Sequence, residues 1–197
     1  MTVSGAIEII GNELFTDFSI KEEPLRSAYK TAYETIISDC SKNGKSKGLL
    51  IIGSIGCGKT AMMKVYQKLF FGQLRGFKMT NGGILKDMLD ELSVSEIKSR
   101  YGYDCKTDLY IDDIGVNFNT ANKYGNKVNI ISEVLMERYD LFISEGWKTH
   151  LSTNLVPKLE DNPNNIPTLY TVYGGRVYDR IKEMCQLITI NSPSLRK

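Results

Sequence analysis

Residues Gly53–Thr60, GSIGCGKT, have the types and spacing of a phosphate-binding loop. Glycines allow the tight turns that bring backbone N–H groups against an anion. We expect the amides from Ile55 to Thr60 and the positive end of the following helix to surround phosphate groups. The Lys59 ammonium would reach the outer two phosphates, and the Thr60 hydroxyl would bind Mg²⁺. The Cys57 side chain is expected only to fill space. The residues predicted to hold the phosphates are Gly53, Ser54, Ile55, Gly56, Cys57, Gly58, Lys59, Thr60 and Ala61.

The segments on both sides of this loop favour the same prediction. Gly48–Ile52 is a continuous apolar run, which is typical of a strand buried on both faces. After the loop, apolar residues recur at helical spacing until Gly72 can end the helix. A phosphate-binding loop requires the order strand, loop, helix, and an accidental turn is the alternative.

Two acids follow a second apolar segment, Leu109–Asp113. A parallel strand that ends in acids places them at the carboxyl edge of the sheet, where ligands of open α/β folds bind. We interpret the pair as a Walker B element, in which Asp112 holds Mg²⁺ through its water and Asp113 orients and deprotonates the attacking water. Alternatively, the two acids cap a turn before Gly115.

A neutral amide follows a third predicted strand, Lys148–Thr153. Asn154 can hydrogen-bond both a phosphate oxygen and the attacking water without adding charge. An ordinary turn at the end of the strand is the alternative. His150, the single histidine of the chain, is expected to be packed or edge-exposed rather than catalytic.

Two arginines, Arg176 and Arg180, are four residues apart and share one face of a predicted helix, beside the apolar Ile181. Guanidinium groups can bind phosphate bidentately. Each arginine could equally pair with a nearby acid at the surface, where such a pair contributes little. The acids in question are Asp179 and Glu183, and the spacing leaves both interpretations open.

Composition and element order favour one α/β domain. Of 197 residues, 42% are hydrophobic and 24% charged, with a net charge of +2 that neither demands nor excludes nucleic acid. Strands alternate with amphipathic helices, which predicts a parallel sheet with helices on both faces. The further expected elements are a helix over Pro24–Asp39, a strand over Phe77–Met79, a helix over Ile84–Leu92 and a last strand over Leu187–Ile190.

Cysteine spacing and hydropathy indicate the cellular compartment of the protein. The four cysteines lie far apart without a C-x-x-C pair, so a zinc site is not expected. They are Cys40, Cys57, Cys105 and Cys185. No charged-then-apolar leader opens the chain, and no apolar run approaches the roughly 18 residues of a membrane span. We expect a cytoplasmic protein without a membrane partner.

Four motifs together resemble those of a known family. GSIGCGKT, LYIDDIG, HLSTNL and YGGRVYDRIKEM, in this order and at these distances, resemble the AAA+ ATPases of the DnaC/DnaI helicase-loader family, with the IstB transposition helpers as close relatives. The resemblance covers about Asp17 to Ile190. It implies a P-loop AAA+ fold without a C-terminal helical lid, with ATP and Mg²⁺ as ligands. It further implies an N-terminal segment over 1–22 and an AAA+ ATPase domain over 23–197.

The resemblance also assigns residues to roles. Asn154 falls on the sensor 1 position, Arg180 on the arginine finger, and Arg176 on a neighbouring arginine that serves the nucleotide site. The finger acts on the ATP of a neighbouring subunit, which implies self-association through Arg180 in trans. Asp113 stands where most AAA+ enzymes carry Glu, so weak hydrolysis, stimulated by DNA or oligomerisation, is expected. The implied catalytic residues are Lys59, Asp113, Asn154 and Arg180.

Two partners are implied, a replicative DNA helicase and single-stranded DNA. Typical loaders hold the helicase with an N-terminal domain, whereas here a short segment such as Ile7–Phe18 would have to make that contact, or the partner differs. Loaders and initiators carry a helical insertion near the second strand that contacts DNA. Here phosphate contacts and a stacking face could come from Lys86, Lys98, Arg100 and Tyr101. A solvated helix is the alternative, because acids are interleaved with these residues.

Two other functions remain open from the sequence. An IstB-like ATPase that recruits a transposase would use the same chemistry. A small-molecule or nucleotide kinase could be built on the same P-loop, but no substrate-binding lid is visible, and Asn154 and Arg180 suit water and oligomer chemistry better.

Overall fold

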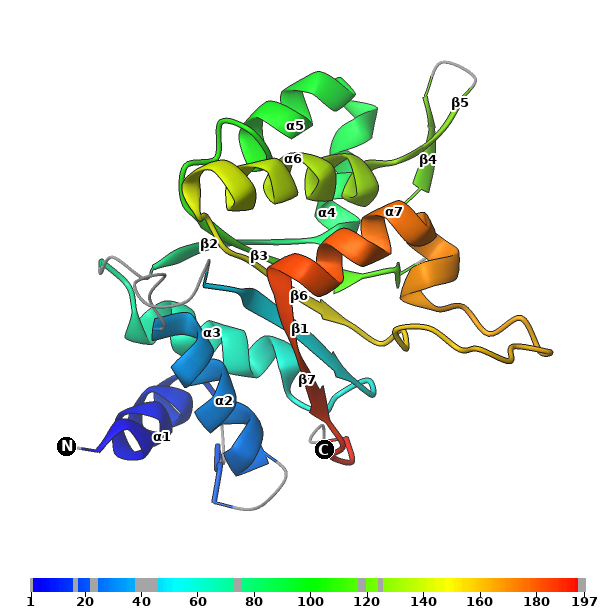
Figure 1. Ribbon diagram of the computed structural model, residues 1–197. Helices are drawn as coiled ribbons and strands as arrows, with labels where there is room; N and C mark the ends of the chain where they lie inside the picture. Colours follow the sequence, from blue (N-terminus) through cyan, green and yellow to red (C-terminus); the bar gives the residue numbers. More distant parts are fainter. Residues whose placement is uncertain are drawn as a thin grey trace.

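Five parallel strands form the central sheet, in the order β2-β3-β6-β1-β7 (Figure 1). The computed structural model describes residues 2–15, 18–21, 25–37, 46–72, 76–116, 120–123 and 126–194. The strands are β1 (Gly48–Gly53), β2 (Phe77–Asn81), β3 (Asp108–Ile114), β6 (Thr149–Thr153) and β7 (Cys185–Ile190). A separate antiparallel hairpin consists of β4 (Thr120–Lys123) and β5 (Asn126–Asn129). The predicted parallel α/β sheet is confirmed.

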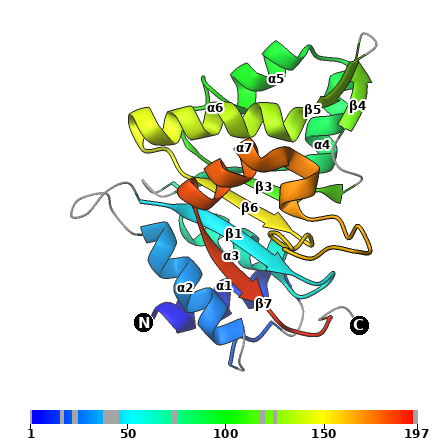
Figure 2. The same ribbon diagram turned by 45° about the vertical axis from the view of Figure 1, so that its right-hand side comes forward.

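Helices lie on both sides of the sheet, as two views show (Figures 1 and 2). One side carries α1 (Val3–Leu14), α2 (Leu25–Ile37) and α3 (Lys59–Leu69). The other side carries α4 (Gly82–Asp87), the 3₁₀ turn η1 (Met88–Asp90), α5 (Val94–Tyr101), α6 (Ile130–Glu145) and α7 (Leu169–Met184). In these described ranges no helix is both long and apolar enough to cross a membrane.

Strand β1 is buried on both faces, as its continuous apolar run predicts. Leu49 and Ile51 pack into the core shared with α1, α2 and α3. Leu50 and Ile52 pack into the core on the opposite face, under α6 and α7. Because side chains alternate across a strand, four consecutive apolar residues supply both cores at once.

The other expected elements differ from the structure mainly at their ends. The described part of the helix expected over Pro24–Asp39 is α2, and Pro24, residues 38–39 and Cys40 lie outside the described residues. The helix expected over Ile84–Leu92 tightens after α4 into η1. Strands β2 and β7 are each longer than expected by two residues, at Asn81 and at Cys185 respectively.

Helix α1 packs on α3. Ile7 is buried in the core beneath α1, and Phe18 packs against the same core. Lys68 of α3 forms an ion pair of 2.5 Å with Glu13 of α1. In the described part of the segment expected to contact a helicase, the large apolar side chain most exposed to solvent is Ile9, at 53%.

Candidate nucleotide site

The loop between β1 and α3 turns through glycines in the left-handed backbone region. Gly56 has φ 82° and Gly58, the N-cap of α3, has φ 98°. Other residues are strained in this conformation. Gly53 is required for a different reason, since a Cβ there would lie 2.6 Å from Cys57 Sγ and 2.7 Å from the Ile190 carbonyl oxygen. The loop therefore depends on glycine at three positions.

Lys59 is only 5% exposed, and its ammonium group lies against the loop. It donates to the carbonyl oxygens of Gly53 at 2.8 Å and Ser54 at 2.9 Å. It also donates to Asn154 Oδ1 at 2.6 Å. The three N–H groups of the ammonium thus bond two carbonyl groups of the loop and the side chain at the end of β6. Lys59 and Asn154, both predicted site residues, are therefore in direct contact.

Thr60 and Asp112 form a second contact between predicted site residues. Thr60 Oγ1 donates to Asp112 Oδ2 at 2.7 Å, which joins α3 to β3. The other carboxylate oxygen accepts hydrogen bonds from the Tyr110 hydroxyl at 2.5 Å and from the Ser152 hydroxyl. Burial, and then the charge of Asp112, raises the pKa of Tyr110 well above its ordinary value, so that this hydroxyl stays a donor. Three hydroxyl groups therefore fix the Asp112 carboxylate.

A bulge separates Asp113 from Asp112. The register between β3 and β6 shifts between Ile111 and Ile114, and Asp113 has φ 48°. The Asp113 N–H donates to Ser152 Oγ at 2.9 Å, which holds the bulge against β6. Bulges at the end of a strand re-aim side chains, and Asp tolerates this backbone region better than most residues. Consequently Asp112 is buried among hydroxyls, whereas Asp113 is half-buried.

The turn that carries Asn154 is fixed by the preceding threonine. Thr153 Oγ1 donates to the carbonyl oxygen of Ile114 at 2.7 Å and accepts from the Leu155 N–H at 3.0 Å. These bonds tie the end of β6 to the end of β3. The amide oxygen of Asn154 is thereby held beside Lys59.

The two arginines lie on α7, which runs from the carboxyl edge of the sheet towards its amino edge (Figure 1). Gly48, at the start of β1, pairs in register with Cys185, which follows α7 directly. Arg180, one turn from the end of α7, lies towards that amino edge, whereas the phosphate-binding loop lies at the other edge. The structure does not bring Arg180 to the phosphate-binding loop of its own chain, and Arg176 is exposed.

Arg180 packs on α6 with its guanidinium 4.6 Å from the centre of the Tyr139 ring. The acids that could have paired with the arginines have other partners. Asp179 pairs with Lys182 at 2.8 Å, and Glu183 accepts from the Tyr139 hydroxyl at 2.7 Å. Among the described residues, neither acid forms an ion pair with either arginine.

The basic residues expected to contact DNA have unlike surroundings. Lys98 pairs with Glu137 at 2.8 Å and Glu133 at 3.5 Å on α6. The hydrogen bond to Glu137 is the main reason that the pKa of Lys98 is raised. Lys86 is half-buried, and Arg100 is exposed. A DNA phosphate would therefore have to compete with two carboxylates for Lys98. At Arg100 it would meet no such competition from the described residues.

Comparison with known proteins identifies the fold. No family model and no curated protein matches the sequence. A crystal structure of DnaI matches with a TM-score of 0.58 and 18% identity over 92% of this chain and 89% of that chain. A crystal structure of the DnaC helicase loader matches with a TM-score of 0.57 and 20% identity over 89% and 95%, respectively. The chain has the AAA+ P-loop fold.

The same fold occurs in an initiator of replication. A structure of DnaA bound to AMPPCP and single-stranded DNA matches with a TM-score of 0.60 and 17% identity. The match covers 89% of this chain and 49% of DnaA. At these identities the likeness concerns the fold, and it confirms the resemblance to DnaC and DnaI structures that the four motifs indicate.

Sequence reasoning missed two residues that position Asp112 in this AAA+ fold. Tyr110 looks like a core residue, and Ser152 lies among other hydroxyl residues inside strand β6, whose sequence is THLST. Strand periodicity offers a signal for the first, because Tyr110 and Asp112 are two residues apart and share one face of β3. Ser152 could be recognised only from the pairing of β3 with β6.

Proposed function

We propose that this protein binds and hydrolyses ATP and acts in DNA replication as a helicase loader that binds single-stranded DNA. The proposal rests on one observation, the meeting of Lys59 with Asn154 and of Thr60 with Asp112 at the ends of three adjacent strands. The solved structures that share the fold support the replication role, since they include a helicase loader and an initiator bound to AMPPCP and single-stranded DNA.

In this proposal the loop and α3 bind the triphosphate. Backbone amides of the loop and the N-terminal end of α3 attract the phosphates, and the Lys59 ammonium neutralises part of their charge. A hydroxyl and a carboxylate are oxygen ligands that Mg²⁺ prefers, so Thr60 and Asp112 fit the ion that the sequence predicts. When bound there, Mg²⁺ would neutralise charge on the transferring phosphate.

Asp113 and Asn154 are proposed to act on the attacking water. The Asp113 carboxylate would orient the water and accept its proton, and the Asn154 amide would hydrogen-bond the water and a phosphate oxygen without adding charge. The strained backbone at Asp113 supports a functional role, because such strain clusters at active sites. The Asp side chain is shorter than the Glu of most AAA+ enzymes, so we propose slow hydrolysis.

Arg180 is proposed to act in trans. Its place towards the edge of the sheet opposite the phosphate-binding loop suits contact with the ATP of a neighbouring copy, with Arg176 beside it on the same helix. An arginine supplied in this way is worth about 10³ to 10⁵ in rate in other NTPases. Isolated monomers should therefore hydrolyse ATP far more slowly than an assembly.

The proposal is tested by identifying the products and partners of the purified protein. With ATP, Mg²⁺, oligo-dT and the replicative helicase of the same cell, we expect ADP and inorganic phosphate to form, together with a stable complex with the helicase. Phosphate transferred to a small acceptor instead of water would show a kinase. A complex with a transposase but none with the helicase would show an IstB-like helper.

A further inference from the structure

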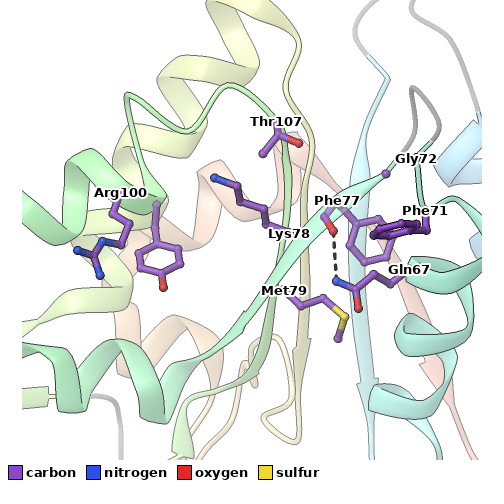
Figure 3. A pocket seen from close by; sticks show the side chains of 10 residues that line it. Gln67, Phe71, Gly72, Phe77, Lys78, Met79, Arg100 and Thr107 are labelled. Carbon is purple, nitrogen blue, oxygen red and sulfur yellow. Dashed lines mark hydrogen bonds between the residues drawn. The ribbon is translucent and has the colours of Figure 1, made fainter. Parts of the chain in front are cut away.

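A groove of about 560 Å³ follows the outer edge of β2, away from the candidate nucleotide site (Figure 3). One wall comes from the end of α3 and the turn after it, with Gln67 and Phe71. The other wall comes from the end of α5, with Arg100 and Tyr101. The floor is β2 itself.

Strand β2 is the last strand of the sheet on this side. It pairs only with β3, from Phe77 opposite Asp108 to Asn81 opposite Asp112. Backbone groups of β2 that face away from β3 therefore have no strand partner in the described part of the chain. One side chain covers a small part of this edge, because Gln67 Nε2 donates to the Phe77 carbonyl oxygen at 3.4 Å. An edge with this little cover can accept a further strand.

The two faces beside this edge differ in chemistry. Phe71 is 84% exposed and lies with Met79 on the α3 side of β2. Lys78 and Arg100 are exposed and lie on the α5 side, as Figure 3 shows. Among the described residues neither cation forms an ion pair. The edge of β2 thus has an apolar wall on one side and a cationic wall on the other.

We infer that this groove is a docking site for an extended segment of a partner protein, which pairs with β2 as a sixth strand. Because side chains alternate across a strand, the segment carries acidic residues that face Lys78 and Arg100 and apolar residues that face Phe71 and Met79. A peptide backbone offers the N–H and C=O groups that the open edge requires. A nucleic-acid backbone lacks the N–H donors, so the edge favours a peptide.

The test is a selection of random dodecapeptides displayed on phage against the full-length protein, followed by anisotropy measurements with the enriched peptides. We expect enriched sequences in which Asp or Glu alternates with apolar residues. Their binding should weaken by about tenfold or more in Lys78→Glu/Arg100→Glu and in Phe71→Ser. Lys64→Glu, on the exposed face of α3, is the matched control and should bind as wild type does. Amide hydrogen exchange over Phe77–Asn81 should slow when the peptide binds.

Four results would overturn the inference. The first is a selection in which no peptide is enriched more strongly on wild type than on Lys78→Glu/Arg100→Glu. The second is that enriched peptides bind wild type and this variant with equal affinity. Labelled oligo-dT that binds wild type and loses its binding in the same variant, without peptide enrichment, would make the groove a nucleic-acid surface. Self-association of the wild type that the charge reversal abolishes in sedimentation would make its occupant a second copy of this chain.

Discussion

Asp112 and Asp113 are neighbours in sequence with different surroundings. Asp112 accepts hydrogen bonds from hydroxyls of three elements, α3, β3 and β6. Asp113 follows it on a bulge held by its own N–H bond to Ser152. One short segment therefore supplies two carboxylates in different environments, a buried one and a half-buried one, which suits the separate roles proposed for them at Mg²⁺ and at the attacking water.

Replacement of Asp113 should separate binding from hydrolysis. In Asp113→Asn the fold and the contacts of Asp112 remain, so ATP should bind with nearly wild-type affinity. Loss of the proton acceptor should lower the rate of phosphate release by about 10² to 10⁴. Phosphate release under single-turnover conditions measures this effect. Equal rates in Asp113→Asn and wild type would exclude Asp113 as the base, and Asp113→Glu should retain activity.

His150 makes stability depend on pH through its burial. The ring is fully buried, and Nδ1 accepts from the Leu49 N–H at 3.2 Å. Burial, and then the charges of Lys148 and Arg138, lowers the pKa of His150 from 6.5 to about 3. Between these two values the unfolded chain binds a proton that the folded chain does not. The free energy of unfolding should therefore be largest above pH 6.5 and should fall on acidification towards pH 3.

The measurement is urea unfolding of wild type and His150→Gln from pH 7.5 to 5. Below pH 6.5 the stability of wild type relative to the variant should fall by up to about 1.4 kcal/mol per pH unit. A difference that stays constant with pH would show that His150 titrates normally in the fold.

At the scale of elements, α6 is held to the sheet by a buried arginine. Arg138 is fully buried and donates to the carbonyl oxygens of Cys105, Thr107 and Lys148. It also donates to the Thr149 hydroxyl. One guanidinium thus joins α6 to the segments that lead into β3 and β6. These contacts lie at the starts of β3 and β6, the end of the sheet opposite the phosphate-binding loop, so we assign Arg138 a structural role.

Removal of this guanidinium should destabilise the fold strongly. In Arg138→Met the acceptors on both segments lose their donors while remaining buried. We expect the free energy of unfolding to fall by about 3 to 5 kcal/mol. Denaturant unfolding of this variant beside the exposed control Arg100→Met measures the loss. A difference below 1 kcal/mol would show that water replaces the guanidinium.

The same arginine explains why α6 is hard to predict from sequence. Its ends have ordinary signals, the Asn129 cap and Gly146 in the left-handed region. A charged residue on the buried face, however, interrupts the apolar periodicity on which helix prediction depends. Strands β1 and β3 and the phosphate-binding loop can be predicted because continuous apolar runs and glycine spacing are local signals. The bulge at Asp113 cannot, because it depends on the partner Ser152 in another strand.

At the scale of the whole molecule, the direction of α7 carries Arg180 away from the phosphate-binding loop of the same chain. Sequence order alone places Arg180 after Asn154 but gives no position relative to the sheet. The paired starts of β1 and β7 supply that position. The groove along β2 likewise has no sequence signal, because one of its walls comes from the end of α5, which the fold brings back beside β2.

A mixing experiment tests whether Arg180 acts in trans. Lys59→Ala retains the arginine and should not bind ATP, whereas Arg180→Ala should bind ATP and lack the arginine. Each variant alone should be nearly inactive. When the two are mixed with DNA, turnover should rise well above the sum of the separate rates, because one copy completes the site of the other. Mixed samples that remain inactive, although sedimentation shows assembly, would contradict an action in trans.

The central claim is that the loop at Gly53–Thr60 and its contacts form a site for magnesium triphosphate, and calorimetric titration with AMPPCP and Mg²⁺ tests it most directly. Wild type should bind one AMPPCP per chain, and the affinity should fall when Mg²⁺ is removed. Lys59→Ala should abolish binding, whereas Lys64→Ala, on the exposed face of the same helix, should leave it unchanged. Failure of the wild type to bind AMPPCP, or equal binding by Lys59→Ala, would contradict the claim.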